Sequence, residues 1–244
     1  RDRSPHTLSG GEQQKLALAA IVARHPPVLV MDEPLSMLDT TAAGDLVAHL
    51  ADLARSGTAV VICEHRAEYL EHIPGLRTLQ LDASVLRDAE KGSANRPFPL
   101  QREGKRSGTA QREGSDAIFD SVHFRLDVSG LGVKLGGRHV LRDLTFSAAG
   151  GTVLAVVGRN GVGKTTLLRA LAGLQKHTGT IRVDGGQPDL GMVFQNADMQ
   201  LFNPTVREEI LYRLPDPDLA RYTWLLDVLG LSRYEEVPPL LLSE

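Results

Sequence analysis

The sequence predicts an α/β fold with a buried parallel sheet, and three short apolar runs are the evidence for that sheet. Residues 28–31, 59–63 and 153–157 are apolar throughout, which is typical of parallel strands covered on both faces. The patterns of residues 41–55 and 166–172 predict helices after two of these strands. Strands that alternate with helices indicate a sheet with ligand-binding loops at the carboxyl ends of its strands.

The composition is that of an ordinary globular chain. Of its 244 residues, 42% are hydrophobic and 23% charged, and the net charge of −3 gives no indication of a nucleic-acid partner. The single cysteine, Cys63, allows no internal disulfide and fits a reducing compartment. No apolar stretch is long enough to span a bilayer. Because the chain begins with Arg1 and ends at Glu244, we expect a fragment of a longer protein.

A glycine-rich loop after the third apolar run predicts phosphate binding and a P-loop NTPase fold. Residues 158–166 match G-x-x-x-x-G-K-[ST], the Walker A motif. Glycines let the backbone approach phosphate closely, and the start of the next helix favours anions. Lys164 would reach the β- and γ-phosphates of ATP, and the Thr165 hydroxyl would bind Mg²⁺. The candidate nucleotide-binding residues of this loop are Gly158, Asn160, Gly161, Gly163, Lys164, Thr165 and Thr166.

A helix is predicted to begin just after Ser9. Ser9 fits the N-cap position, and Glu12 three residues later completes a capping box. The two prolines at residues 26–27 would end this helix. Capping alone accounts for Ser9, so any further role depends on the motifs that follow it.

Two acidic residues follow the apolar run at residues 28–31. Asp32 and Glu33 would lie at the carboxyl end of a parallel strand, where α/β sheets place ligand chemistry. Asp32 would hold Mg²⁺, directly or through water, and Glu33 would act as the general base toward an attacking water. An ordinary acidic corner between a strand and a loop is the alternative interpretation.

One histidine occupies the same kind of position. His65 follows the apolar run at residues 59–63, as Glu33 follows the run before it. It would contact the γ-phosphate and orient water. The other histidines lack such a context and are read as structural: His6, His25, His49, His72, His123, His139 and His177.

Together these motifs resemble the C-terminal half of an ABC-type nucleotide-binding domain, a fold with a mixed sheet. Residues 8–13 resemble the signature motif, residues 28–34 Walker B, residues 36–39 the D-loop, and His65 the H-loop histidine. No Walker A motif precedes them, so this half lacks its own phosphate loop. In the family, the signature closes on the γ-phosphate across an interface, which implies nucleotide contacts for Ser9, Gly10 and Gly11.

The sequence divides into three parts. Residues 1–87 form the first half-domain, residues 88–117 a linker, and residues 118–244 a second half-domain. The linker is rich in Gly, Ser, Arg and Glu and repeats Gln-Arg-Glu-Gly at residues 101–104 and 111–114. Such a composition buries too little apolar surface to fold, so we expect a flexible connection.

The second half-domain resembles the N-terminal half of an ABC domain. Residues 122–128, 132–135 and 140–146 have the pattern of strands that precede the Walker A strand. The family usually has an adenine-stacking aromatic residue, the A-loop, at the position that we align with Leu135. The loss of stacking there would cost roughly 0.5–1.5 kcal/mol of nucleotide affinity.

Residues 192–195 resemble the Q-loop of the same family. In that motif Gln195 would reach Mg²⁺ and the attacking water and would sense a membrane subunit. Residues 195–202 and 205–210 resemble the ATPases of energy-coupling-factor (ECF) importers of cobalt and vitamins. The resemblance implies integral membrane subunits as partners and a cytoplasmic location, peripheral on the inner face of the cell membrane.

The order of the motifs is inverted, because the signature and Walker B precede the Walker A motif. The end of the chain, residues 242–244, resembles the start of a second signature. We therefore expect a piece of a tandem protein that runs from one signature to the next. ABC domains pair head to tail, so in the intact tandem Lys164 and Ser9 would serve one ATP, and Glu33 and His65 the other.

The motifs also fit two other functions: a soluble tandem ABC ATPase with no role in transport, and a non-catalytic fragment. Whatever the function, the two halves come from homologous repeats and should fold together as one permuted domain. The strand at residues 153–157 would then join those at residues 28–31 and 59–63 in one sheet. Lys164 would lie beside Asp32, with Glu33 and His65 nearby, and Ser9 would face away.

Overall fold

The computed structural model describes residues 8–36, 38–65, 67–71, 73–88, 124–187 and 189–239. Most of the predicted linker and residues 242–244 lie outside these ranges. The helices are α1 (Gly10–Val22), α2 (Thr40–Arg55), α3 (Lys164–Leu171), α4 (Val206–Leu211) and α5 (Leu219–Val228), with short 3₁₀ turns η1 (Ala67–Tyr69), η2 (Ala197–Gln200) and η3 (Ser232–Tyr234). The strands are β1 (Val28–Asp32), β2 (Ala59–Glu64), β3 (Arg77–Asp82), β4 (Val85–Asp88), β5 (Arg125–Leu135), β6 (Arg138–Ala149), β7 (Val153–Val157), β8 (Thr178–Val183) and β9 (Leu190–Val193).

A six-stranded sheet combines strands from both parts of the chain, in the order β4-β3-β7-β2-β1-β9. Adjacent strands in this sheet are parallel, except that β3 and β4 are antiparallel, so the sheet is mixed, as predicted. The strand that precedes the glycine-rich loop, β7, lies between β3 and β2, so the three predicted buried strands share this sheet. The two segments therefore form one permuted domain.

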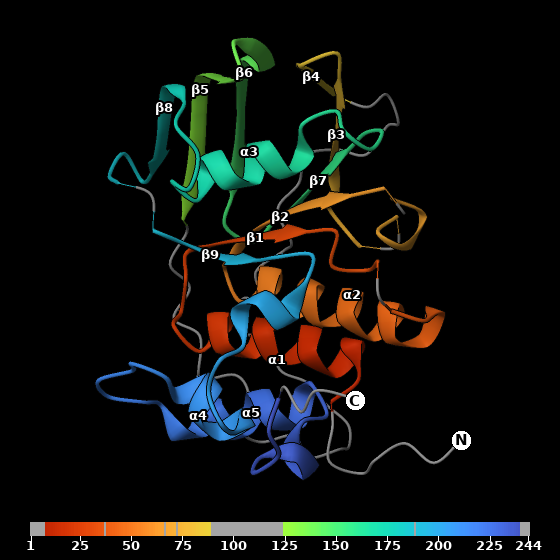
Figure 1. The fold of residues 1–244 in the computed structure, drawn as a ribbon, viewed down its shortest axis with the longest axis vertical. Coiled ribbons are helices and arrows are strands. Elements are labelled where there is room, and N and C mark those ends of the chain that lie inside the picture. Colours follow the sequence, from red (N-terminus) through yellow and green to blue (C-terminus); the bar gives the residue numbers. More distant parts are fainter. Residues whose placement is uncertain are drawn as a thin grey trace, which may run out of the picture.

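The layers of the molecule follow from the two-residue period of the strands (Figure 1). In β1, Val28 and Val30 face the core that contains α3, whereas Leu29 and Met31 face the core that contains α1, α2 and α5. Helix α3 lies between the six-stranded sheet and a second sheet, and α1 and α2 cover the opposite face, with α4 and α5 beyond them.

The second sheet is antiparallel, in the order β6-β5-β8. The sequence indicated separate strands at residues 122–128 and 132–135, but the structure has one strand, β5, over 125–135. The interruption is a register shift between Val128 and Leu131, where Gly130 has a φ of 64°. A glycine absorbs the extra residue as a bulge, so pairing with β6 continues past it.

The helix boundaries follow local capping. Helix α1 has the predicted capping box between Ser9 and Glu12 and ends before the two prolines. Helix α3 begins at Lys164, two residues before the predicted start, because Gly163 already occupies the N-cap with a φ of 113°. No helix in the described ranges has the length and apolarity that crossing a membrane requires.

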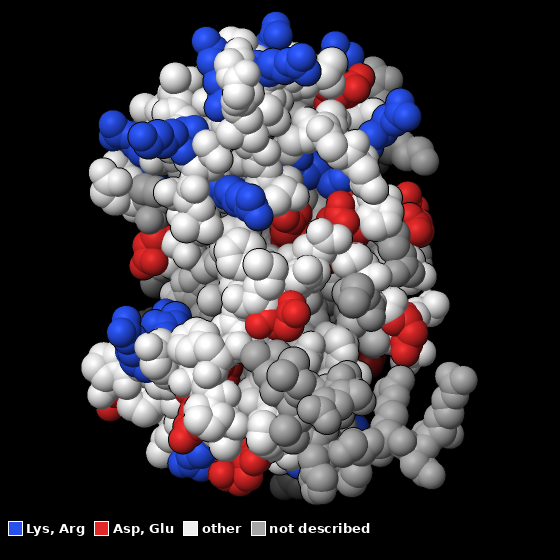
Figure 2. Space-filling view, in the orientation of Figure 1, with Lys and Arg blue, Asp and Glu red and all other residues white. Residues whose placement is uncertain are grey.

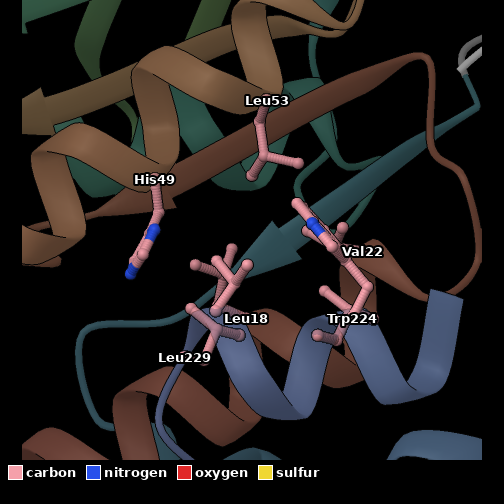
Figure 3. A pocket seen from close by; sticks show the side chains of 8 residues that line it. Leu18, Val22, His49, Leu53, Trp224 and Leu229 are labelled. Atoms are coloured by element: carbon pink, nitrogen blue, oxygen red, sulfur yellow. The ribbon is translucent and has the colours of Figure 1, made fainter. Parts of the chain in front are cut away.

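A small cavity lies where α1, α2 and α5 meet (Figure 3). Its volume is about 10 Å³, and Leu18, His49 and Trp224 are among the side chains that line it. A space of this size holds at most about one water molecule. The cavity is therefore a packing defect between helices, with His49 at its edge.

Candidate functional site

Four neighbouring strands end at the same edge of the large sheet. The strands β7, β2, β1 and β9 are adjacent and mutually parallel. The glycine-rich loop follows β7, His65 follows β2, Glu33 follows β1, and Gln195 follows β9 closely. The carboxyl ends of parallel strands are where open α/β sheets bind ligands. The topology thus brings together the candidate residues of both halves.

The glycine-rich loop is shaped by glycines that no other residue would replace without strain. Gly161 and Gly163 have φ angles of 78° and 113°, in the left-handed region. A Cβ on Gly158 would lie 2.5 Å from the carbonyl oxygen of Leu81 in β3, too close for any side chain. The backbone is therefore held in a tight turn that leads into α3, as a phosphate cradle requires.

Lys164 is buried at the centre of this edge. Its Nζ donates a hydrogen bond to the carbonyl oxygen of Gly158 at 2.9 Å and lies 3.3 Å from Oε1 of Glu33. Only 5% of the lysine side chain and 15% of the glutamate side chain are exposed. Because this ion pair is mostly buried, dissolved salt screens the attraction between its two charges only weakly.

Glu33 has three partners on three different strands or loops. Its Oε1 pairs with Lys164, its Oε2 accepts a hydrogen bond from Nε2 of Gln195 at 3.1 Å, and Nδ1 of His65 lies 3.8 Å from Oε2. Its backbone has a φ of 46°, which is uncommon for a residue other than glycine. Such backbone strain costs about 1–3 kcal/mol and persists where the surrounding contacts hold the residue in this conformation.

Asp32 is a buried carboxylate at this edge, and Thr165, the residue after Lys164, donates a hydrogen bond to it. Burial raises the pKa of Asp32, and a hydrogen bond from the side chain of Thr165 opposes the rise. Its Oδ1 is buried and has no hydrogen-bond partner among the described residues. The sequence predicts that Lys164 lies beside Asp32, and this stays a prediction; the ion-pair partner of Lys164 in the structure is the next residue along the chain, Glu33.

The carboxylate of Asp32 and the hydroxyl of Thr165 fit a Mg²⁺ ion. Mg²⁺ prefers one or two carboxylates together with substrate phosphates and water, and the unpartnered Oδ1 of Asp32 is a vacant acceptor. In the described part of the chain, no three His, Cys, Asp or Glu side chains gather into a metal cluster. An ion held here would therefore depend on phosphate oxygens for most of its ligands.

His65 lies between two carboxylates at the end of β2. Its Nδ1 is 3.1 Å from Oε1 of Glu64 and 3.8 Å from Oε2 of Glu33. The histidine side chain is 44% exposed, whereas the side chain of Glu64 is completely buried. The sequence pattern indicates His65 but gives no signal for Glu64, because the burial of that carboxylate depends on the position of β2 inside the sheet.

The signature residues lie elsewhere. Ser9, Gly10 and Gly11 are at the start of α1, on the opposite face of the sheet from α3 (Figure 1). The Ser9 hydroxyl accepts a hydrogen bond from the backbone N–H of Glu12, and the Glu12 carboxylate accepts one from the hydroxyl of Tyr234. A Cβ on Gly10 would meet no atom within 4 Å, so this residue borders open space.

Leu135 is at the end of β5 and is 44% exposed. The same hairpin reaches the glycine-rich loop, because a Cβ on Gly163 would lie 3.0 Å from side-chain atoms of Val140 and Leu141. Strand β6 of this hairpin therefore contacts the N-cap of α3, and Leu135 lies at the end of the neighbouring strand β5. The residue present there is aliphatic.

Comparisons with known proteins agree with this geometry. The family model described as "ABC transporter" matches the chain in two stretches, residues 1–36 and 141–240. A "Putative ABC transporter ATP-binding protein" of Treponema denticola is 34% identical over 100% of the chain and 53% of its own length. A "Putative HMP/thiamine import ATP-binding protein" of Bacillus subtilis is 30% identical over 100% of the chain and 52% of its own length. The chain thus spans about half the length of these curated relatives.

Proposed function

The chain belongs to the ABC transporter family, and from this premise we propose that it binds and hydrolyses ATP at the carboxyl edge of its large sheet to power transport. The observation that carries the proposal is the position of Glu33, whose carboxylate contacts both Lys164 and Gln195. A buried cation and a carboxylate at hydrogen-bonding distance are the groups needed to hold a terminal phosphate and to activate water beside it.

The roles follow from charge and position. Lys164, at the start of α3, donates to the β- and γ-phosphates, while the loop N–H groups and the hydroxyl of Thr166 bind the remaining phosphate oxygens. Glu33 accepts a proton from the attacking water, and Gln195 and His65 orient that water and the γ-phosphate. When ATP enters, Lys164 exchanges its contact with Glu33 for phosphate, which leaves the carboxylate available as a base.

Mg²⁺ is the proposed cofactor, held by Thr165 and Asp32, with Gln195 in reach of it. A bound Mg²⁺ neutralises charge on the β- and γ-phosphates. The burial of Asp32 and the vacant Oδ1 support this assignment. A hydrogen bond from the Thr165 side chain to Asp32 joins the two proposed ligands.

The signature residues are proposed to act on a second domain. Ser9, Gly10 and Gly11 begin a helix whose free N–H groups and dipole favour an anion. They start α1, on the other face of the sheet from α3, so they would reach a γ-phosphate only across a head-to-tail interface. The open space beside Gly10 supports such an approach.

The transport partner is proposed to be an integral membrane subunit of an ECF-type importer of a vitamin or metal ion. Two large apolar side chains just after Gln195 support a docking face, because Met199 is 78% and Phe202 is 63% exposed. The buried carboxylate of Glu209 accepts the backbone N–H groups of Phe202 and Asn203, which fixes the shape of that face. The name of the Bacillus subtilis relative, which refers to thiamine import, agrees with this class. The chain would then be cytoplasmic and peripheral on the inner face of the cell membrane.

We further propose that the two segments belong to different domains of a tandem protein. Residues 1–87 would be the C-terminal half of a first ABC domain and residues 118–244 the N-terminal half of a second, joined by residues 88–117. In the intact tandem, Glu33 and Lys164 would then serve different ATP molecules, and the site that combines them would form when this part of the chain folds on its own. The length of the relatives, about twice the part that the chain matches, supports this division.

The surface charge favours a polyanionic ligand near the glycine-rich loop. Figure 2 shows Lys and Arg side chains gathered over the part of the molecule that β5, β6, β8 and α3 form. A positive surface raises the local concentration of nucleotide and speeds its association at low salt. The exposed basic residues of this part are Arg125, Lys134, Arg138, Arg142, Arg159, Arg169, Lys176 and Arg182.

A crosslinking experiment tests the transport assignment. The native Cys63 is completely buried, so a cysteine introduced at Phe202 would be the reactive thiol of the described chain. We expect Phe202→Cys to crosslink to a membrane subunit in membranes, and a control cysteine at the exposed Leu174 to give no such product. Crosslinks to soluble proteins alone would contradict transport.

A further inference from the structure

Glu64 is a carboxylate that the fold buries completely at the edge of the candidate site. It is the last residue of β2, its side chain is 0% exposed, and it directly precedes His65. An isolated charge in such a place would cost several kcal/mol, so a buried carboxylate persists only where donors surround it. The contacts of Glu64 therefore indicate its role in the site.

The two oxygens of Glu64 bind different parts of the site. Oε1 accepts the backbone N–H of His65 at 2.8 Å and lies 3.1 Å from Nδ1 of the same ring. Oε2 accepts the backbone N–H of Leu35 at 3.2 Å, in the turn that follows Glu33. One carboxylate thus joins the histidine ring, the end of β2 and the turn that carries Glu33.

We propose that Glu64 is a positioning residue that holds the Nδ1–H of His65 and leaves Nε2 as the ring nitrogen that meets the substrate. The inference rests on the proposed function, in which His65 contacts the terminal phosphate and the attacking water. A carboxylate bonded to one ring nitrogen fixes both the tautomer and the orientation of an imidazole. In the neutral ring, Nε2 is then an acceptor for water; in the protonated ring, its N–H faces the phosphate.

The charged groups around the ring explain why a second carboxylate is useful. Nδ1 of His65 lies 3.1 Å from Glu64 but also 3.8 Å from Oε2 of Glu33, whose other oxygen pairs with Lys164. Without Glu64, the Nδ1–H would turn to Glu33 and occupy the carboxylate that is proposed to accept the proton of water. Glu64 therefore keeps the histidine oriented and the general base available.

The first test measures the tautomer of the His65 ring directly. The ¹⁵N chemical shifts of the His65 ring, measured on the labelled whole chain without nucleotide, report which nitrogen carries the proton. We expect the proton of the neutral ring on Nδ1, and in Glu64→Gln we expect a mixture of the two tautomers. The exposed Glu68 of η1 gives a matched control, Glu68→Gln, which should leave the shifts unchanged. A wild-type ring with its proton on Nε2 overturns the proposal.

The second test separates positioning from a merely structural role. Glu64→Gln should lower kcat for ATP hydrolysis by roughly 10- to 100-fold, by analogy with carboxylates that orient metal-binding histidines, with little change in KM. In a His65→Ala background the same substitution should have almost no further effect, because the two residues act as one unit. Independent, multiplicative losses would overturn the proposal for Glu64. A His65→Ala variant with full activity would instead contradict the role of His65 in the proposed function.

Discussion

The carboxylate of Glu33 lies 3.3 Å from Nζ of Lys164 and ties the two segments of the chain into one site. Glu33 ends β1 in the first segment, and Lys164 begins α3 in the second. Each side chain gives the other the opposite charge that it needs in a mostly buried place. A nucleotide phosphate that takes the place of the carboxylate beside Lys164 would open the pair.

Removal of Lys164 should weaken nucleotide binding. A hydrogen bond to a charged group contributes about 1.5–3 kcal/mol, so Lys164→Ala should lower the affinity for ATP by about 10- to 150-fold. Isothermal titration with ATP measures the change. The exposed Lys176 gives the control Lys176→Ala, which should bind as the wild type does. Equal affinities of Lys164→Ala and the wild type would remove Lys164 from the phosphate site.

Glu33→Gln should separate binding from chemistry. The amide cannot accept a proton from water, and loss of a general base typically costs about 10²–10⁴-fold in rate. Binding should be preserved or tighter, since the substitution also removes the carboxylate that competes with phosphate for Lys164. Single-turnover kinetics measures the rate of hydrolysis, and an ATP titration measures the affinity. Hydrolysis at the wild-type rate would show that another group accepts the proton.

Leu135→Tyr should create the stacking platform that the chain lacks. An aromatic contact contributes about 0.5–1.5 kcal/mol, so affinity for ATP should rise by about 2- to 12-fold, while affinity for inorganic triphosphate stays the same. Leu174 is 61% exposed and supplies the control Leu174→Tyr. A gain for both ligands, or for neither, would place the adenine away from the tip of the β5–β6 hairpin.

The stability of the fold should fall in mild acid through His49, at the cavity in Figure 3. Burial lowers the pKa of His49, with a smaller effect of Lys15 in the same direction and of Asp52 against it. The stabilising contribution of the neutral ring is present above the unfolded value, about 6.5, and is lost as the pH falls through the lower folded value.

Urea unfolding at pH 7.5 and 5.5 tests this dependence. Burial also lowers the pKa of His25, so His49→Gln should reduce the difference in the free energy of unfolding between the two pH values without abolishing it. The exposed His177 provides the control, His177→Gln. An unchanged difference in the His49 variant would show that another group causes the acid sensitivity.

The parts of the fold that the sequence predicts are those with a strong local signal. The apolar runs identified β1, β2 and β7, and the glycine pattern identified the loop before α3. Strand β8 was not predicted, because it lies at the edge of its sheet and only two of its six residues are buried. Exposed edge strands carry a weak hydrophobic pattern.

The residues of the site also differ in how well the sequence predicts their positions. The meeting of Lys164 with Glu33 could be predicted because both residues follow buried parallel strands, whose carboxyl ends share one edge. The place of Glu64 could not, since an acidic residue at a strand end is ordinarily exposed. Its burial depends on β7, which belongs to the other segment and pairs with β2.

One ATP should lie between Lys164 of one domain and the signature of another, and complementation between two inactive variants tests this arrangement. Lys164→Ala removes the phosphate-binding side of the site, and Gly10→Asp adds a negative charge on the signature side. Gly10 borders open space in the first turn of α1, where an acidic residue is tolerated, so the variant should fold. Each variant alone should hydrolyse little ATP. The mixture should regain activity, because one interface then combines an intact Lys164 with an intact Gly10. A mixture that stays as inactive as its components would contradict the shared site.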